Sequence, residues 1–235
     1  MTDKVGLRLG YKAPNFDAET TQGKINFYDY IGDSWVILFS HTFLTLAFPS
    51  LFASTSCSDF TPVCTTELAE AARLAPEFKK RNVKQIGLSC NELGSHEKWV
   101  ADINKFGSVE LAFPIIADPS RKIAQLYDML DEQDLTNLDD KGIPFTVRTV
   151  FVIDPAKRVR LSLQYPASTG RQFSEILRCI DSLQLTDREK VATPQGWQPG
   201  DKLIVHNSLK TEDAKKHFEG KEVEEVFPYL RFVSV

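Results

Sequence analysis

The segment DFTPVCTTEL, residues 59–68, joins an apolar part of the chain to an amphipathic helical pattern. Pro62 suits the first turn of a helix, because a backbone N–H at that position would have no intrahelical partner. Cys64 then falls in the same turn, where free N–H groups and the positive end of the helix dipole stabilise a thiolate. This position predicts a reactive cysteine; the alternative is a small apolar residue packed in the core.

On both sides of this segment, short apolar runs predict strands, and apolar residues at helical spacing predict helices between them. The alternation of strands and helices favours a parallel central sheet, whereas the turn at residues 154–157 makes a hairpin and hence a mixed sheet. We therefore predict an α/β, thioredoxin-like fold with a mixed central sheet. The predicted strands are 36–39, 83–89, 113–117, 147–153 and 159–163, and the helical residues are Leu68, Ala72, Ala75 and Phe78, then Trp99, Ile103 and Phe106 behind a Ser95 cap, then Phe173, Ile176, Leu177 and Ile180.

Length and a change of composition predict two domains. The chain has 235 residues, more than one domain of ~150 residues requires. Residues 193–201 are rich in turn-forming residues, and the remainder is charged with short apolar patches. We predict a thioredoxin-like domain over residues 1–187 and a small C-terminal domain over residues 188–235.

Composition excludes several classes of partner. The net charge is −4, and Lys and Arg are scattered, so the basic surface that nucleic-acid binding requires is missing. Residues 35–58 hold no Asp, Glu, Lys or Arg, but Pro49 and the Ser and Thr residues argue against a membrane span. Four cysteines without a CxxC pair, and an N-terminus without an apolar signal region, favour the cytoplasm, with the mitochondrion as the alternative.

The motif at Cys64 also carries a resemblance. DFTPVCTTEL resembles the peroxidatic-cysteine motif of the peroxiredoxins. The blocks GDSWVILFSH (32–41), TVRTVFVIDPAKRVRLSLQYPASTGR (146–171) and VATPQGWQPGD (191–201) are similar to the one-cysteine subfamily. The resemblance implies a thioredoxin-like peroxidase domain with a C-terminal dimerisation domain, and hence a homodimer.

The resemblance further implies a role for four residues. Cys64 matches the peroxidatic cysteine, whose thiolate attacks a peroxide oxygen and becomes a sulfenic acid. Thr61 and Arg148 match the residues that donate hydrogen bonds to the peroxide, and Glu67 matches the carboxylate that holds the guanidinium. Without the resemblance, Thr61 is an N-cap, Arg148 a salt-bridge partner and Glu67 a carboxylate at the helix dipole. The implied substrates are hydrogen peroxide and alkyl hydroperoxides.

The source of reducing equivalents is expected to be external. Two-cysteine relatives carry a Val-Cys-Pro element near the C-terminus, and none follows Cys179. The resemblance therefore implies an external thiol reductant, such as glutathione or thioredoxin, and no cofactor. The four histidines are not spaced as metal ligands with one another or with the cysteines, so no metal is expected. We expect His96 and His217 to be exposed to solvent.

Two other function classes are weighed against the peroxidase. Some relatives combine peroxidase with phospholipase activity through a Gly-x-Ser-x-Gly element, but residues 32–36 here read Gly-Asp-Ser-Trp-Val, and Tyr28 stands where the histidine of the triad would be. Phospholipase activity is therefore not expected. The other alternative is a holdase-like protein without catalysis.

Residues 42–57 depart from the family pattern. Relatives pass from Ser-His through one proline and one variable residue into the cysteine motif, whereas this insert follows His41. We interpret the insert as a retained intron or a faulty gene model, with a genuine loop at the sheet edge as the alternative. It separates His41 from the motif and adds Cys57, a candidate for a non-native disulfide with Cys64. We predict a weaker peroxidase than the same chain with one proline in place of residues 42–57, and the limiting case is a form with weak or no activity.

Overall fold

The computed structural model describes residues 6–41, 59–131, 142 and 144–235. The chain divides into two compact units, Met1–Phe173 and Ser174–Val235. This division lies before the boundary at residues 187 and 188 that composition suggests, because nearly all of the helix Phe173–Arg188 belongs to the second unit. A change in composition marks the turn-rich segment after that helix and does not report how the helix packs.

A seven-stranded mixed sheet forms the centre of the first unit, in the order β2-β1-β5-β4-β3-β6-β7. β3, β4 and β5 run parallel, whereas β1 pairs antiparallel with β2 and β5, and β6 pairs antiparallel with β3 and β7. The prediction of a mixed α/β sheet is confirmed. The strands are β1 (Asp17–Thr20), β2 (Gly23–Asn26), β3 (Trp35–Ser40), β4 (Val83–Ser89), β5 (Ile115–Ala117), β6 (Arg148–Ile153) and β7 (Val159–Tyr165).

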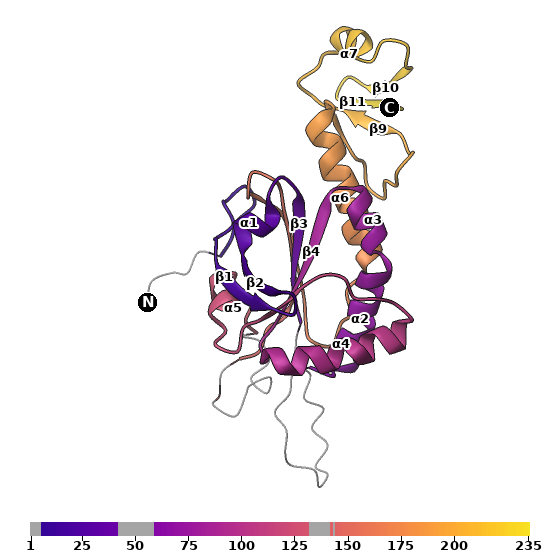
Figure 1. The fold of residues 1–235 in the computed structure, drawn as a ribbon. Helices are drawn as coiled ribbons and strands as arrows, with labels where there is room; N and C mark the ends of the chain where they lie inside the picture. The colour runs from indigo at the N-terminus through magenta and orange to yellow at the C-terminus, as the bar shows by residue number, and fades with distance from the viewer. Residues whose placement is uncertain (1–5, 42–58, 132–141, 143) are drawn as a thin grey trace. The chain divides into compact units, whose positions relative to one another are not determined.

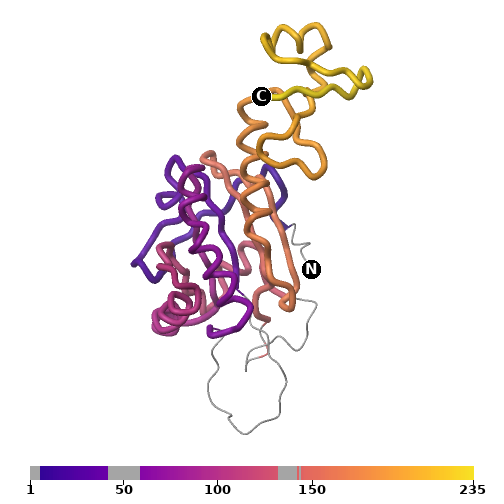
Figure 2. The backbone as a smooth tube through the Cα atoms, turned by 90° about the vertical axis from the view of Figure 1, so that its right-hand side faces the viewer, coloured from indigo at the N-terminus to yellow at the C-terminus, as the bar shows by residue number. Residues whose placement is uncertain are grey.

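Helices cover both faces of this sheet (Figure 1). α1 and α5 pack on the face that carries Val36 and Leu38, in one buried cluster. α2 lies on the opposite face, where Gln85 of β4 donates a hydrogen bond to the Ala71 carbonyl at 2.9 Å. α2 also packs against α4, and Figure 2 shows the backbone of both helices, purple and magenta, in a view turned by 90°. The helices of this unit are α1 (Phe27–Ile31), α2 (Pro62–Arg73), α3 (Ala75–Lys80), α4 (Leu93–Gly107) and α5 (Lys122–Leu126).

The second unit has its own sheet and its own core. Its strands follow the order β10-β11-β9-β8, all antiparallel. Trp197, Val205 and Phe218 are among the residues buried in its core. The elements are α6 (Phe173–Arg188), β8 (Val191–Ala192), β9 (Leu203–Val205), α7 (Thr211–His217), β10 (Val223–Phe227) and β11 (Leu230–Val233).

Helix α4 differs from its sequence-based description in two details. Its spacing predicts a buried Phe106, but this side chain is 62 % exposed. At this end of α4 the contact with α2 is made by Gly107, where a side chain would meet Ala69 at 2.8 Å, and Phe106 points outward instead. The helix begins at Leu93, so Ser95 lies inside it rather than at its N-cap.

Candidate active site

The topology of the sheet brings three separate segments to one place. β3 and β6 pair antiparallel with Phe39 opposite Val150, so the end of β3 lies beside the start of β6. Arg148 is the first residue of β6, and His41 directly follows β3. The first turn of α2, which begins at Pro62, brings Cys64 to the same edge.

Cys64 and Arg148 are in direct contact. Arg148 Nη1 lies 3.1 Å from the Cys64 sulfur and donates a hydrogen bond to Glu67 Oε2 at 2.8 Å. Arg148 Nε donates to the Ala167 carbonyl at 2.8 Å, which fixes the plane of the guanidinium. Cys64 and Arg148 are fully buried, so solvent screens the charge of the guanidinium poorly at the sulfur. The structure therefore brings Cys64, Glu67 and Arg148 together.

A second arginine, Arg171, was missed by the sequence analysis. Its backbone N–H and Nε donate to Glu67 Oε1 at 2.6 and 3.1 Å, and its Nη2 donates to Glu67 Oε2 at 2.7 Å. Its Nη1 donates to the carbonyls of Ser40 and Thr149 at 2.8 and 3.0 Å. Arg171 thus joins the carboxylate to both strands that carry the site. The only sequence signal was its place at the end of the block 146–171.

The charge state of Glu67 follows from these contacts. Burial of the carboxyl raises its pKa, but the charge and hydrogen bonds of Arg171, together with the charge of Arg148, outweigh burial and hold the pKa below 4.5. Glu67 is therefore ionised at neutral pH. Its negative charge faces two buried guanidinium groups, and Arg148 Nη1 contacts both this carboxylate and the Cys64 sulfur.

Two buried donors of the site have no partner among the described residues. Thr61 is the N-cap of α2, yet its side chain makes no capping hydrogen bond, and its hydroxyl is buried without a partner. Nη2 of Arg148 is also buried without a hydrogen-bond partner among the described residues. An unsatisfied buried polar group costs about 1–3 kcal/mol. Both donors are therefore available for a hydrogen bond to a small polar ligand.

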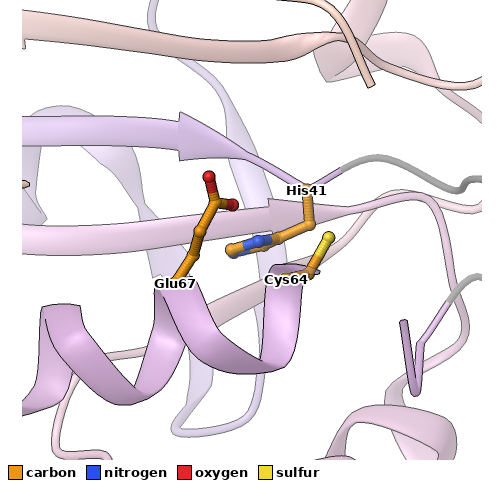
Figure 3. A group of neighbouring side chains, drawn as sticks. All are labelled: His41, Cys64 and Glu67. Atoms are coloured by element: carbon orange, nitrogen blue, oxygen red, sulfur yellow. The ribbon is translucent and has the colours of Figure 1, made fainter. Parts of the chain in front are cut away.

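His41 also lies at the site. One ligand atom each of His41, Cys64 and Glu67 lie within 4.8 Å of one another (Figure 3). The expectation that the spacing of His41 separates it from the cysteines is therefore wrong. Spacing along the chain does not measure distance in space, because the pairing of strands and the start of α2 bring His41 and Cys64 together.

These three side chains are a poor site for a divalent cation. Both oxygens of Glu67 already accept hydrogen bonds from guanidinium groups, and Arg148 donates to the sulfur. Burial, together with the charges of Arg171, Arg148 and His96, holds the pKa of His41 well below 6.5, so its imidazole is neutral at neutral pH. Two neighbouring guanidinium groups repel a metal ion, and they favour an anion at this position.

His96 is buried, contrary to the sequence expectation that it is exposed to solvent. Its Nδ1 lies 2.7 Å from Asp59 Oδ2, and Ser89 donates to Asp59 Oδ1 at 3.1 Å. His96 and Trp99 are three residues apart, so both face the core from one side of α4. The contacts of Asp59 fix the backbone just before the cysteine turn.

The remaining sequence candidates lie away from this arrangement. Burial raises the pKa of Cys90 to about 12 and that of Cys179 to about 11, so both are protonated at neutral pH. The Ser34 hydroxyl donates to Asn82 Oδ1 at 2.9 Å, and within the described part of the chain no histidine bonds it. A hydrolase triad requires such a histidine.

Residues 42–57 and Cys57 lie outside the described residues. The predicted loss of activity caused by the insert and the Cys57–Cys64 disulfide therefore stay predictions. Within the ranges that the structure covers, no helix combines the length and the apolarity needed to cross a membrane.

A buried thiol at a helix N-terminus, in contact with an arginine on a thioredoxin-like sheet, defines the class of thiol-dependent peroxidases. The AhpC/TSA family matches residues 9–162, and the C-terminal domain of 1-Cys peroxiredoxin matches residues 182–221. The chain is 51 % identical over 234 residues to peroxiredoxin PRX1, mitochondrial, of Saccharomyces cerevisiae, covering 99 % of this chain and 83 % of that protein.

Solved structures similar to this fold are also peroxiredoxins. The fold is similar to that of peroxiredoxin 6 of Arenicola marina, with a TM-score of 0.85, 44 % identity and coverage of 97 % of this chain and 98 % of the other. A yeast mitochondrial 1-Cys peroxiredoxin, solved to study thiol resolution via glutathione and thioredoxin systems, has a TM-score of 0.82, 50 % identity and coverage of 97 % and 100 %. The chain belongs to the AhpC/TSA family as a one-cysteine peroxiredoxin, and its activity is that of a thiol-dependent peroxidase.

Proposed function

We propose that Cys64 is the nucleophile of this peroxidase. Its thiolate attacks one oxygen of the peroxide, the O–O bond breaks, and the leaving alkoxide or hydroxide takes up a proton, which gives a sulfenic acid and an alcohol or water. The contact with Arg148 is the main support. A cation about 4 Å away contributes about 4 kcal/mol at an effective dielectric of 20, whereas a helix end contributes about 0.3–1 kcal/mol.

Thr61 and Arg148 stabilise the breaking O–O bond in this proposal. Ionisation of the sulfur alone gains little, because a thiol of lower pKa is also a weaker nucleophile. Charge develops on both peroxide oxygens as the bond stretches, and preorganised donors lower the energy of that state. The Thr61 hydroxyl and Arg148 Nη2 are buried and unpartnered among the described residues, so they have the capacity to bind the peroxide. These unpartnered donors support the proposed stabilisation of the breaking bond, as the contact with Arg148 supports the choice of Cys64 as the nucleophile.

Glu67 and Arg171 are positioning residues. Glu67 holds Arg148 by Oε2, and Arg171 holds Glu67 through three hydrogen bonds. Because Arg171 also binds the carbonyls of Ser40 and Thr149, the orientation of the reactive guanidinium is tied to the backbone of β3 and β6. Such a support keeps the donors in place without reorganisation during the reaction.

The reductant of the sulfenic acid is proposed to be an external thiol without any bound cofactor. The yeast relative resolves its thiol via glutathione and thioredoxin systems, and Cys90 and Cys179 are protonated thiols at neutral pH. Hydrogen peroxide and alkyl hydroperoxides are the proposed substrates. We further propose a homodimer that uses the domain of residues 188–235, in the cytoplasm or, as the name of the yeast relative suggests, the mitochondrion.

A test of the peroxide-binding donors uses Thr61→Val, which keeps the shape and removes the hydroxyl. We expect the second-order rate constant with hydrogen peroxide to fall about 100-fold or more, as for loss of one donor to a developing charge, and Thr61→Ser to restore it. The matched control is Thr66→Val, because the Thr66 hydroxyl is exposed and bonds only its own helix, at the Val63 carbonyl. Stopped-flow measurement decides: equal rates for Thr61→Val and wild type would contradict the mechanism.

A further inference from the structure

A surface hollow lies on the outer side of the helix turn that carries Cys64. Its volume is about 450 Å³, within the range of roughly 300–1,000 Å³ typical of small-molecule sites. The walls come from the segment before α2, from the first turn of α2 and from α4. The lining residues are Phe60, Thr65, Trp99, Asp102, Lys105 and Phe106.

The hollow combines exposed aromatic rings with two opposite charges. Phe60 and Phe106 are 46 % and 62 % exposed. Asp102 and Lys105 are exposed on α4, and neither forms an ion pair within the part of the chain that the structure describes. Phe60 has a φ of 64°, an unfavourable backbone conformation for a bulky residue, and such strain is concentrated at functional sites.

The hollow is connected to the reactive turn by hydrogen bonds. Trp99 Nε1 donates to Thr65 Oγ1 at 3.0 Å, and Thr65 Oγ1 donates to the Thr61 carbonyl at 2.8 Å. Thr65 follows Cys64 directly, so a molecule in the hollow lies against the turn that carries the sulfur. Because Cys64 itself is fully buried, a thiol larger than the peroxide reaches the sulfur only when this turn opens.

We propose that this hollow is the docking site of a glutathione-type tripeptide thiol. Such a thiol carries carboxylates at both ends and one ammonium group, which complement Lys105 and Asp102, while its peptide groups lie over the aromatic rings. The inference rests on the peroxidase function proposed above and names where the reductant binds.

The chemistry of the docked thiol is balanced in two steps. The thiol sulfur attacks the Cys64 sulfenic acid, an S–S bond forms, and the hydroxyl leaves as water after it takes the thiol proton. A second molecule of the thiol then attacks the mixed disulfide, which releases the Cys64 thiolate, a proton and the oxidised disulfide of the reductant. The hollow serves the first step, because the reductant must arrive at a buried sulfur.

The kinetic test compares a charged and an uncharged thiol. The full-length protein is oxidised with one equivalent of hydrogen peroxide, and reduction of the Cys64 sulfenic acid is followed with glutathione and with 2-mercaptoethanol. For Lys105→Glu we expect the ratio of the glutathione rate constant to the 2-mercaptoethanol rate constant to fall by up to about fivefold, the upper end of the contribution of one exposed charge pair. The control Lys98→Glu alters an exposed lysine of α4 that does not line the hollow.

Three results would overturn the proposal. They are an unchanged ratio in Lys105→Glu, an equal change in Lys98→Glu, and an effect confined to oxidation by cumene hydroperoxide, which would assign the hollow to the peroxide.

A second measurement uses the reduced protein and S-methylglutathione, which binds without reacting. A dissociation constant raised by up to about fivefold in Lys105→Glu alone supports docking, and equal affinities exclude it. The binding measurement tests docking even if no sulfenic acid forms on Cys64. Absence of the sulfenic acid would contradict the proposed function, not the docking site.

Discussion

Cys64 and Cys90 are two buried thiols of the same unit, and they differ in the charge that each one touches. Arg148 Nη1 lies 3.1 Å from the Cys64 sulfur, and the same nitrogen donates a hydrogen bond to Glu67. At Cys90, burial raises the pKa to about 12, because the opposing charge of Arg121 is too weak to offset it and Asp118 adds to the rise. Burial alone keeps the Cys90 thiol protonated, whereas the proposed reactivity of Cys64 depends on the guanidinium held in contact with its sulfur.

The largest effect is expected when the sulfur of Cys64 is removed. We expect Cys64→Ser to lower the rate of peroxide consumption on the order of 10³-fold or more, because a serine hydroxyl stays protonated beside Arg148. The measurement is peroxide consumption with glutathione as the reductant, together with dimedone labelling and peptide mass spectrometry of the wild type. Labelling mainly at Cys90 or Cys179 would contradict the assignment.

The second prediction removes the carboxylate beneath Arg148. Glu67→Gln leaves Arg148 and Arg171 buried without an anion, so we expect the free energy of unfolding to fall by about 3 kcal/mol. Guanidinium chloride titration measures it. The control is Glu77→Gln, whose ion pairs with Lys80 and Arg81 are at the surface and contribute about 0–1 kcal/mol. Equal losses for both variants would show that the buried charge network does not stabilise the fold.

The same carboxylate predicts how stability depends on pH. The pKa of Glu67 in the folded protein lies below 4.5, so its contribution is fully present above the unfolded-state value near 4.5. The contribution is lost as the pH falls through the lower folded value. We expect the wild type to lose stability below pH 4.5 more steeply than Glu67→Gln, as measured by thermal unfolding at pH 3 to 7. Parallel curves for the two proteins would refute this linkage.

The third prediction separates the charge of Arg148 from its shape. Arg148→Lys keeps the positive charge, but one ammonium group cannot reach Glu67, the sulfur and the peroxide with the geometry of a guanidinium. We expect the second-order rate constant with hydrogen peroxide to fall about 100-fold, the cost of a misplaced catalytic group. The matched control is Arg73→Lys on the exposed side of α2. An unchanged rate for Arg148→Lys would mean that charge alone is sufficient.

The smallest effect is expected at the other thiol. Cys90→Ala removes a buried sulfur and its hydrogen bond with Thr146, which lowers the free energy of unfolding by about 1 kcal/mol. Because the proposed mechanism gives Cys90 no part, we expect the rate with peroxide to stay within about twofold of the wild type. A large loss of rate at unchanged stability would give Cys90 a role in the chemistry.

The sequence predicts the position of Cys64 and the strand of Arg148 better than it predicts the contacts around them. Pro62 and the apolar pattern after it locate Cys64 in a helical first turn, and residues 147–153 locate the strand of Arg148. Arg171 was missed because its hydrogen bonds reach carbonyls of two strands. A local sequence pattern does not reveal contacts between distant segments. His96 was misjudged for the same reason, since its partner Asp59 belongs to a different segment. The hairpin of β1 and β2 was also missed, because charged residues obscure its alternation.

Trp99 gives the enzyme an intrinsic optical reporter. Its indole is buried, bonds the turn that carries Cys64 through Thr65, and lies edge-on to His41 with 5.7 Å between the ring centres. We expect opening of that turn to break the indole hydrogen bond and to change the polarity around the ring, so that the emission of Trp99 reports oxidation of the sulfur. The other tryptophans, Trp35 and Trp197, lie at the start of β3 and in the second unit, and their replacement by phenylalanine leaves a single fluorophore at the site.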